Sequence, residues 1–186
     1  MAIDFINQEN LSQNFAKYKE IAVVIIIIHF LIEFYVNMRQ LNRLKQNNGI
    51  ANYLQLLKIS EEEFIKGKLY KKDKLQFSII IDVLKTTLET VLLLVYYQPI
   101  VWNFAADILT NFGINSMSEF ARAYTFLLIE TVRSVIFEIP VDWYSSFVIE
   151  ERHGFNKKTA KIFIYDVCVG FALRIGFSYP ILYGFL

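Results

Sequence analysis

The chain has 186 residues, of which 55% are hydrophobic and 16% aromatic, with only 7 glycines and 3 prolines. It is more apolar than an ordinary soluble domain, which favours an all-α membrane protein with the lipid bilayer as its partner. A net charge of +1 gives no reason to expect a nucleic-acid partner, and the single cysteine, Cys168, excludes an internal disulfide.

The first predicted membrane span is 21–38, with the sequence IAVVIIIIHFLIEFYVNM. As a helix it extends about 27 Å, close to the hydrocarbon thickness of a bilayer. Mixed charges before it, and the lack of a pair of small residues after it, favour a retained helix over a cleaved signal peptide. Within it, His29 is interpreted as a hydrogen-bonded group between helices and not as a metal ligand.

The second predicted span is 77–102, which is long enough to cross the bilayer with some tilt. Ser60 and Glu63 have the spacing of a capping box, so this helix is expected to begin well before the membrane.

Two further spans complete the predicted set. The third, 119–141, is expected to break or kink near Pro140, which lacks a backbone donor. The fourth, 162–186, is expected to bend at Pro180. We therefore predict multi-pass transmembrane helices with about four spans.

Lysines and arginines are concentrated in the connection after the first span and in the one before the fourth, and there is none between Asn103 and Ser118. By the positive-inside rule, both basic connections are predicted to be cytoplasmic. Both ends of the chain are then expected on the opposite side.

Ionisable side chains in the later spans would each cost about 2.5 kcal/mol or more in hydrocarbon, so they normally face water or partner helices. The third span also carries Glu138, and the fourth carries Asp166 and Arg174. Spacings of three and four place such groups on one helical face. The candidate lining of a water-filled chamber is Asp82, Lys85, Glu89, Glu130 and Arg133. The alternative is that Asp82 with Lys85, and Glu130 with Arg133, pair inside a packed bundle.

The stretch FVIEERHGFNKKT, 147–159, gathers acids, bases and a histidine directly behind an apolar segment. A helical zinc protease site needs two histidines one turn apart, H-E-x-x-H, and the chain lacks that pattern. The stretch is therefore predicted to be a polar connection with no catalytic or metal-binding residue. Gly154 suits a helix C-terminus or turn, and Asn156 a local cap.

The same stretch, preceded by IPVDWYSS and followed by FIYD, resembles the signature of the type 1 CAAX prenyl proteases. The segments EEEFIKGKLYKKDKLQF, YYQPIVW and MRQLNRL also resemble that family. Nearly the whole chain is covered, but only by the family's N-terminal membrane region.

This resemblance implies a multi-pass protein of the endoplasmic reticulum membrane, in which a helical barrel surrounds a water-filled chamber. The complete family enzyme uses zinc to remove the last three residues from prenylated proteins that end in CaaX. For residues 1–186 the resemblance implies an N-terminal transmembrane module without the zinc catalytic domain. The module is expected to have no cofactor of its own and to be inactive alone.

The resemblance carries over residue by residue in the signature, which is expected to dock the cytoplasmic end of the third helix against the catalytic part. Its residues are Glu150, Glu151, Arg152, His153, Gly154, Phe155 and Asn156. Two other classes of function stay open: a stand-alone membrane scaffold or pseudoenzyme, and a small channel or transporter.

Overall fold

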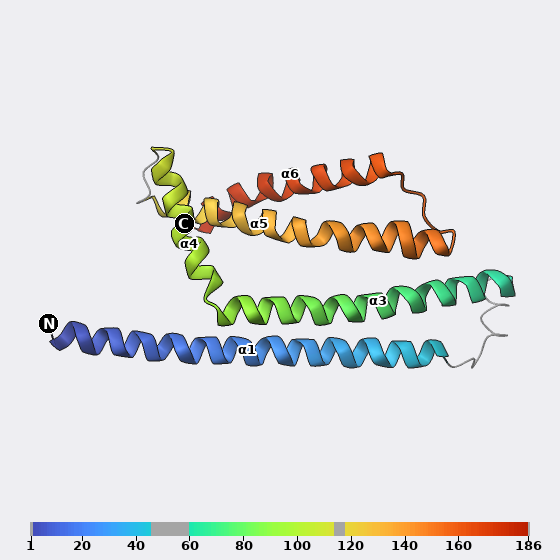
Figure 1. Ribbon diagram of the computed structural model, residues 1–186, viewed down its shortest axis with the longest axis horizontal. Helices are drawn as coiled ribbons and strands as arrows, with labels where there is room; N and C mark the ends of the chain where they lie inside the picture. The colour runs from blue at the N-terminus through green and yellow to red at the C-terminus, as the bar shows by residue number, and fades with distance from the viewer. Residues whose placement is uncertain (1, 46–59, 114–117, 186) are drawn as a thin grey trace. The chain divides into compact units, whose positions relative to one another are not determined.

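The computed structural model describes residues 2–45, 60–113 and 118–185. Within these ranges all regular structure is helical, which confirms the all-α prediction. Lys58, part of the first predicted basic connection, and residue 186 lie outside the described residues. The elements, shown in Figure 1, are α1 (Ala2–Lys45), α3 (Glu61–Leu94), α4 (Tyr97–Asn111), α5 (Glu119–Tyr144), the π-helix η1 (Ser145–Glu150) and α6 (Ala160–Phe185).

The chain divides into two compact units. One contains α1 and the part of α3 from Leu75 onward, and the other contains α3 up to Lys74 together with everything from Gln98. In the first unit, α1 and α3 run antiparallel and side by side (Figure 1). Asn37 donates a hydrogen bond to Asp82 at 3.2 Å, and so joins the two helices.

Part of α1 has the properties of a membrane helix. Residues Lys17–Lys45 form the one described helix that is long and apolar enough to cross a bilayer, with a mean hydropathy of 2.3 over its best window. None of that window is buried inside the protein, whereas the core helix of a soluble protein would be largely covered. This criterion supports one crossing, at the place predicted for the first span.

The prediction of one continuous helix over 77–102 is wrong. The helix α3 ends at Leu94, and α4 begins at Tyr97. Between them, Tyr96 has a φ of 56°, in the left-handed region that non-glycine residues seldom adopt. The apolar pattern is interrupted at Tyr96, Tyr97 and Gln98, but it resumes at Ile100, so the interruption is short. Pro99 is a further local signal, because proline is tolerated in the first turn of a helix and disfavoured in its interior.

Pro140, where a break or kink was expected, does not end its helix, and Pro180, where a bend was expected, also lies inside a helix. The helix α5 continues past Pro140 to Tyr144 and leads directly into η1, while α6 continues past Pro180. Ser145 then donates its backbone N–H to the carbonyls of Val141 and Asp142. The change in winding therefore comes after Pro140 and not at it.

The capping box that begins α3 is confirmed. The Glu63 backbone N–H donates to the Ser60 hydroxyl at 3.3 Å, and the Ser60 N–H donates to the Glu63 carboxylate at 3.4 Å. These reciprocal bonds satisfy donors that a helix start leaves open.

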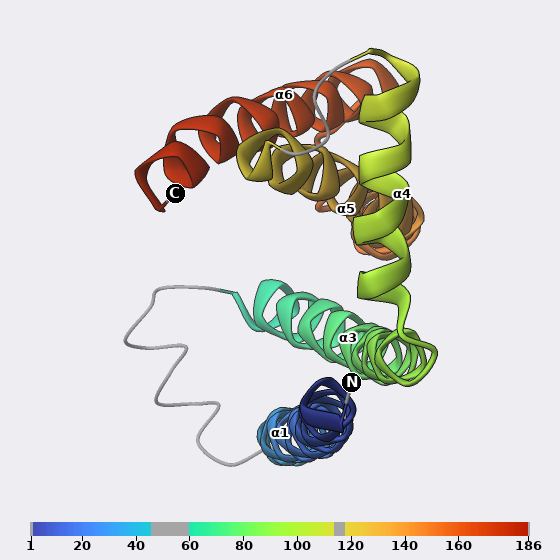
Figure 2. The same ribbon diagram turned by 90° about the vertical axis from the view of Figure 1, so that its left-hand side faces the viewer.

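In the second unit, α5 and α6 pack side by side and antiparallel (Figure 2). Phe163 of α6 is buried, with its ring centroid 5.3 Å from that of Trp143 and 5.7 Å from that of Phe147. Most other large apolar side chains of the described residues are exposed, including Ile136, Ile164 and Phe177. Surfaces of this kind are suited to contact with lipid.

Candidate functional site

The signature residues close the end of η1 as a tight turn. Gly154 has a φ of 68°, and its N–H donates to the Glu151 carbonyl at 2.9 Å. The N–H groups of Phe155 and Asn156 both donate to the Glu150 carbonyl, at 2.9 and 3.3 Å. A left-handed glycine that follows a helix and returns donors to its last carbonyls is a common helix end. The predicted role of Gly154 is thus confirmed.

Side-chain hydrogen bonds hold the segment between the turn and the start of α6. The Asn156 amide donates to the Glu151 carboxylate at 3.0 Å, and its oxygen accepts the Lys158 backbone N–H at 2.7 Å. The Thr159 hydroxyl accepts the N–H of Ile162 at 3.4 Å, which caps α6. Asn156 therefore acts as the local cap that the sequence predicts.

The turn is attached to the first part of α3 by Asp73. One carboxylate oxygen of Asp73 lies 2.9 Å from Nε2 of His153 and 3.3 Å from Nη1 of Arg152. The His153 side chain is only 12% exposed. In this position His153 joins two segments of the chain.

A second attachment uses the next helical residue, Lys74. Its ammonium group lies 3.0 Å from the Glu150 carboxylate and donates to the Tyr70 hydroxyl at 2.9 Å. The Tyr70 hydroxyl in turn donates to the same Glu150 oxygen at 3.2 Å. Glu150 is thereby held by two donors from α3.

Ring contacts complete the attachment. The Phe155 ring centroid lies 4.9 Å from that of Tyr70, and the Lys66 ammonium lies 5.3 Å from the Phe155 ring centroid. We call these contacting residues the α3 clasp; they are Lys66, Tyr70, Asp73 and Lys74 of α3 with Glu150, Arg152, His153 and Phe155 of the signature.

The charges of the clasp shift the titration of its own groups. The hydrogen bond from His153, supported by Arg152, holds the pKa of Asp73 below its ordinary value. Hydrogen bonds to Tyr70 and then to Glu150 raise the pKa of Lys74. Both shifts favour the charged forms of Asp73 and Lys74.

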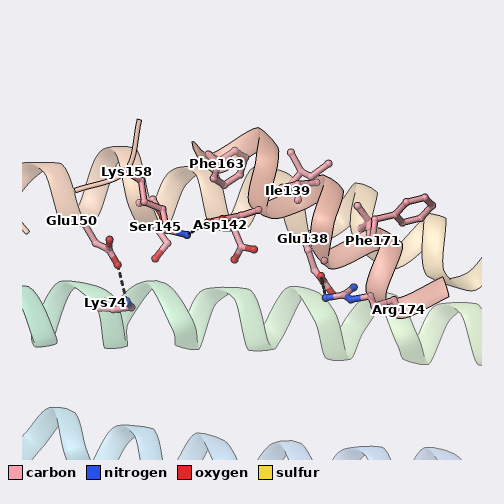
Figure 3. Close-up of a pocket in the computed structure, with 15 residues that line it drawn as sticks. Lys74, Glu138, Ile139, Asp142, Ser145, Glu150, Lys158, Phe163, Phe171 and Arg174 are labelled. Carbon is pink, nitrogen blue, oxygen red and sulfur yellow. Dashed lines mark hydrogen bonds and ion pairs between the residues drawn. The ribbon is translucent and has the colours of Figure 1, made fainter. Parts of the chain in front are cut away.

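A cavity of about 350 Å³ lies beside the clasp, between the end of α5, η1 and α6 (Figure 3). Arg174 pairs with Glu138 at 2.7 Å, and Lys158 pairs with Asp166 at 2.8 Å. The charged residues of the lining are Lys74, Glu138, Asp142, Glu150, Lys158, Asp166 and Arg174. Each cation has a carboxylate partner and one acid remains, so the charged part of the lining has a slight negative excess.

A family profile described as "CAAX prenyl protease N-terminal, five membrane helices" matches residues 40–186. The chain belongs to this CAAX prenyl protease N-terminal family. The resemblance found in the signature is therefore confirmed by a match over most of the chain.

Individual members of the CAAX prenyl protease family are also similar to this chain in sequence. A CAAX prenyl protease 1 homolog of Oryza sativa is 32% identical over 164 residues, and one of Dictyostelium discoideum is 34% identical over 165 residues. These matches cover 88% and 86% of this chain and 38% of each relative. The crystal structure of S. mikatae Ste24p matches with a TM-score of 0.77 and 30% identity, over 90% of this chain and 38% of that one. The chain thus spans well under half the length of the relatives that it matches.

The predicted chamber residues of this CAAX prenyl protease family member do not line the cavity beside the clasp. Glu130 instead pairs with Arg133 at 2.9 Å along α5, which matches the open alternative for that pair. The Asp82 carboxylate accepts hydrogen bonds from Asn37 and Ser78. Lys85 and Glu89 likewise do not belong to the cavity lining. Whether the five line another water-filled space stays a prediction.

The two histidines of this chain lie in different parts of the structure and have different partners. Nε2 of His29 lies 3.4 Å from Glu33 of the same helix, so the contact found for it is not the predicted one between helices. His153 belongs to the clasp. Among residues 2–45, 60–113 and 118–185, no group of three or more histidine, cysteine, aspartate or glutamate side chains is placed to hold a metal ion.

Sequence reasoning identified the signature but missed its partners on α3. Tyr70 and Asp73 lie three residues apart and Lys66 and Tyr70 four apart, a spacing that places them on one helical face. This shared face was the only sign in the sequence that these α3 residues act together. It does not predict which segment they contact, because His153 lies 80 residues from Asp73 in the chain.

Acidification is expected to weaken the clasp. Because the pKa of Asp73 is lowered in the folded protein, its contribution to stability is complete above the pKa of an unfolded aspartate, about 4, and is lost as pH falls through the lower folded value. Thermal unfolding in detergent micelles between pH 7 and pH 3 measures this loss. Asp73→Asn should show a smaller decline over that range, and an unchanged decline would contradict the assignment.

Substitution of Gly154 is expected to destabilise the turn. Gly154→Ala should cost about 1 kcal/mol, because its φ of 68° is unfavourable for a residue with a Cβ. Gly154→Asn should cost less, since asparagine tolerates that region. Chemical unfolding compares the two variants. Gly67→Ala in α3 is the control, where an added Cβ meets no atom within 4 Å, and it should not destabilise.

Proposed function

We propose that this chain forms the N-terminal membrane portion of a zinc metalloendopeptidase that removes the last three residues from prenylated proteins ending in CaaX. The proposal is supported by the family match over residues 40–186 and by the similarity to Ste24p. It assigns the zinc ion and the hydrolytic groups to a separate catalytic part, since the chain has no H-E-x-x-H pattern. When bound there, zinc would activate the attacking water.

The observation that carries the proposal is the α3 clasp. The signature residues hold the end of η1 against the first half of α3 through Asp73 and Lys74. A catalytic part needs a membrane portion whose helix ends keep a defined position, because small displacements of positioning groups are costly in catalysis. The signature is proposed to provide that position and to dock the catalytic part at the same end, where Glu151 and Arg152 are exposed.

The proposed membrane arrangement retains about four crossings in the endoplasmic reticulum membrane, with both basic connections cytoplasmic. The break at Tyr96 shortens the second crossing to 77–94, still about 27 Å of helix. The other crossings are 21–38, 119–141 and 162–186. Together they are proposed to form part of a helical barrel around a water-filled chamber. Its candidate lining remains Asp82, Lys85, Glu89, Glu130 and Arg133.

The experiment that tests this function joins the chain in frame to the remaining part of the Dictyostelium relative. We expect the chimera to release a C-terminal tripeptide from a farnesylated CaaX peptide in a zinc-dependent reaction. The same peptide without its prenyl group should be cut poorly, and the chain alone should cut neither. A chimera that inserts and binds zinc without releasing the tripeptide would favour a scaffold, and solute flux through liposomes containing the chain alone would favour a channel.

A further inference from the structure

A second pocket lies where the start of α5 meets the end of α6. It has a volume of about 530 Å³ and is lined by Glu119, Phe120, Tyr179 and Tyr183. Because α5 has 26 residues and is about 39 Å long, this pocket, which is lined by Glu119 and Phe120 at the start of α5, is at the opposite end of that helix from the clasp. It is therefore separate from the site described above.

The Phe120 ring stands nearly perpendicular to both tyrosine rings of this pocket. The Phe120 ring is 5.2 Å from Tyr179 at an interplanar angle of 82°, and 6.1 Å from Tyr183 at 81°. Perpendicular rings turn their faces in different directions, as the walls of a cage do. Tyr179 is 51% exposed and Tyr183 72% exposed, so much of both rings is open at the surface.

The charge of the lining decides what such a cage can hold. Glu119 is its one ionisable acid, and it is exposed beside the rings. The face of an aromatic ring attracts cations, and a cage of rings is the arrangement that recognises quaternary ammonium groups. A nearby carboxylate adds attraction for the same positive charge. A primary ammonium is more strongly hydrated and would lose more on entering.

The surroundings identify the source of that cation. The chain belongs to a family with membrane helices, and α6 exposes the apolar side chains of Phe177 and Ile181 within the same two turns as Tyr179 and Tyr183. Tyrosines are enriched at the level of lipid headgroups. We propose that this pocket binds the choline headgroup of a phosphatidylcholine molecule whose acyl chains lie along α6. The proposal depends on the membrane placement and not on protease activity.

The test measures binding of diheptanoyl phosphatidylcholine to the purified chain in maltoside micelles, followed by magnetisation transfer to the choline methyl protons. We expect phosphatidylcholine to bind about tenfold more tightly than the matching phosphatidylethanolamine. Tyr183→Leu and Glu119→Gln should each weaken binding about fivefold. Tyr179→Phe and Tyr183→Phe should retain it within about twofold, since the ring face remains.

If a leucine variant fails to fold, binding by the phenylalanine variants still measures whether the ring faces hold the headgroup. Tyr165→Leu is the matched control, an exposed tyrosine of α6 that does not belong to the pocket lining, and it should bind as the original chain does. Equal affinity for phosphatidylethanolamine or phosphatidylglycerol would overturn the proposal. So would equal weakening by phenylalanine and leucine, or weakening by the Tyr165 control. An inactive chimera would leave these results unaffected.

Discussion

Asp73→Leu is expected to lower the free energy of unfolding by about 2 kcal/mol. The substitution removes the acceptor that Arg152 and His153 share, and it leaves the imidazole, only 12% exposed, without that partner. Denaturant titration of the chain in mixed micelles measures the loss. Asp107→Leu, which replaces an exposed aspartate of α4, is the matched control and should change stability much less. Equal losses of unfolding free energy in the two variants would show that the contacts of the clasp do not stabilise the chain.

A double-mutant cycle separates the contact from other effects of the substitution. His153→Gln and Asp73→Leu should be non-additive, with a coupling of about 1 kcal/mol, because each removes the same hydrogen bond. In a chimera completed with a catalytic part, His153→Gln should impair assembly more than zinc content. Loss of zinc with intact assembly would assign the histidine to the metal site instead.

Arg174→Leu is expected to destabilise the chain by about 2 kcal/mol in a bilayer. The substitution leaves the Glu138 carboxylate without its 2.7 Å partner in the cavity, within a predicted membrane span. The Ser134 hydroxyl still donates to Glu138 at 2.8 Å, which limits the cost. Unfolding in lipid bicelles measures the effect. Lys161→Leu, an exposed cation of the same helix, is the control and should have little effect.

The double variant Glu138→Leu with Arg174→Leu distinguishes a structural pair from a functional cavity. It should recover most of the lost stability, because neither charge is then left alone. If the cavity serves the proposed enzyme, the recovered protein should still have low activity in the chimera. Full activity with recovered stability would mean that the pair is only structural.

Local patterns predicted the helices well because helix formation depends largely on nearby residues. The capping box at Ser60 and the turn at Gly154 both rest on side chains within a few positions of the bonds that they make. The break at Tyr96 and the π-helix after Tyr144 were missed. Neither place contains a glycine, the usual residue at an irregular backbone position, and the break or kink expected near Pro140 is not a break in the helix.

The candidate site was predicted in part. The signature identified Glu150 and His153 as important residues and led to the family, which the match over residues 40–186 confirms. It did not reveal Tyr70, Asp73 or Lys74 as their partners. A periodic pattern shows which face of a helix a residue occupies, but it carries no information about the distant segment that covers that face.

The sequence by itself determined the helical class, the family and the absence of an H-E-x-x-H zinc motif, because composition, short-range spacing and a linear signature are properties of the chain alone. Only the tertiary structure decided which charges meet. It joined Asp73 to His153, paired Glu138 with Arg174, and brought Tyr179 beside Phe120. Those choices depend on how helices far apart in the chain pack, since ion pairs and ring contacts act only over a few ångströms.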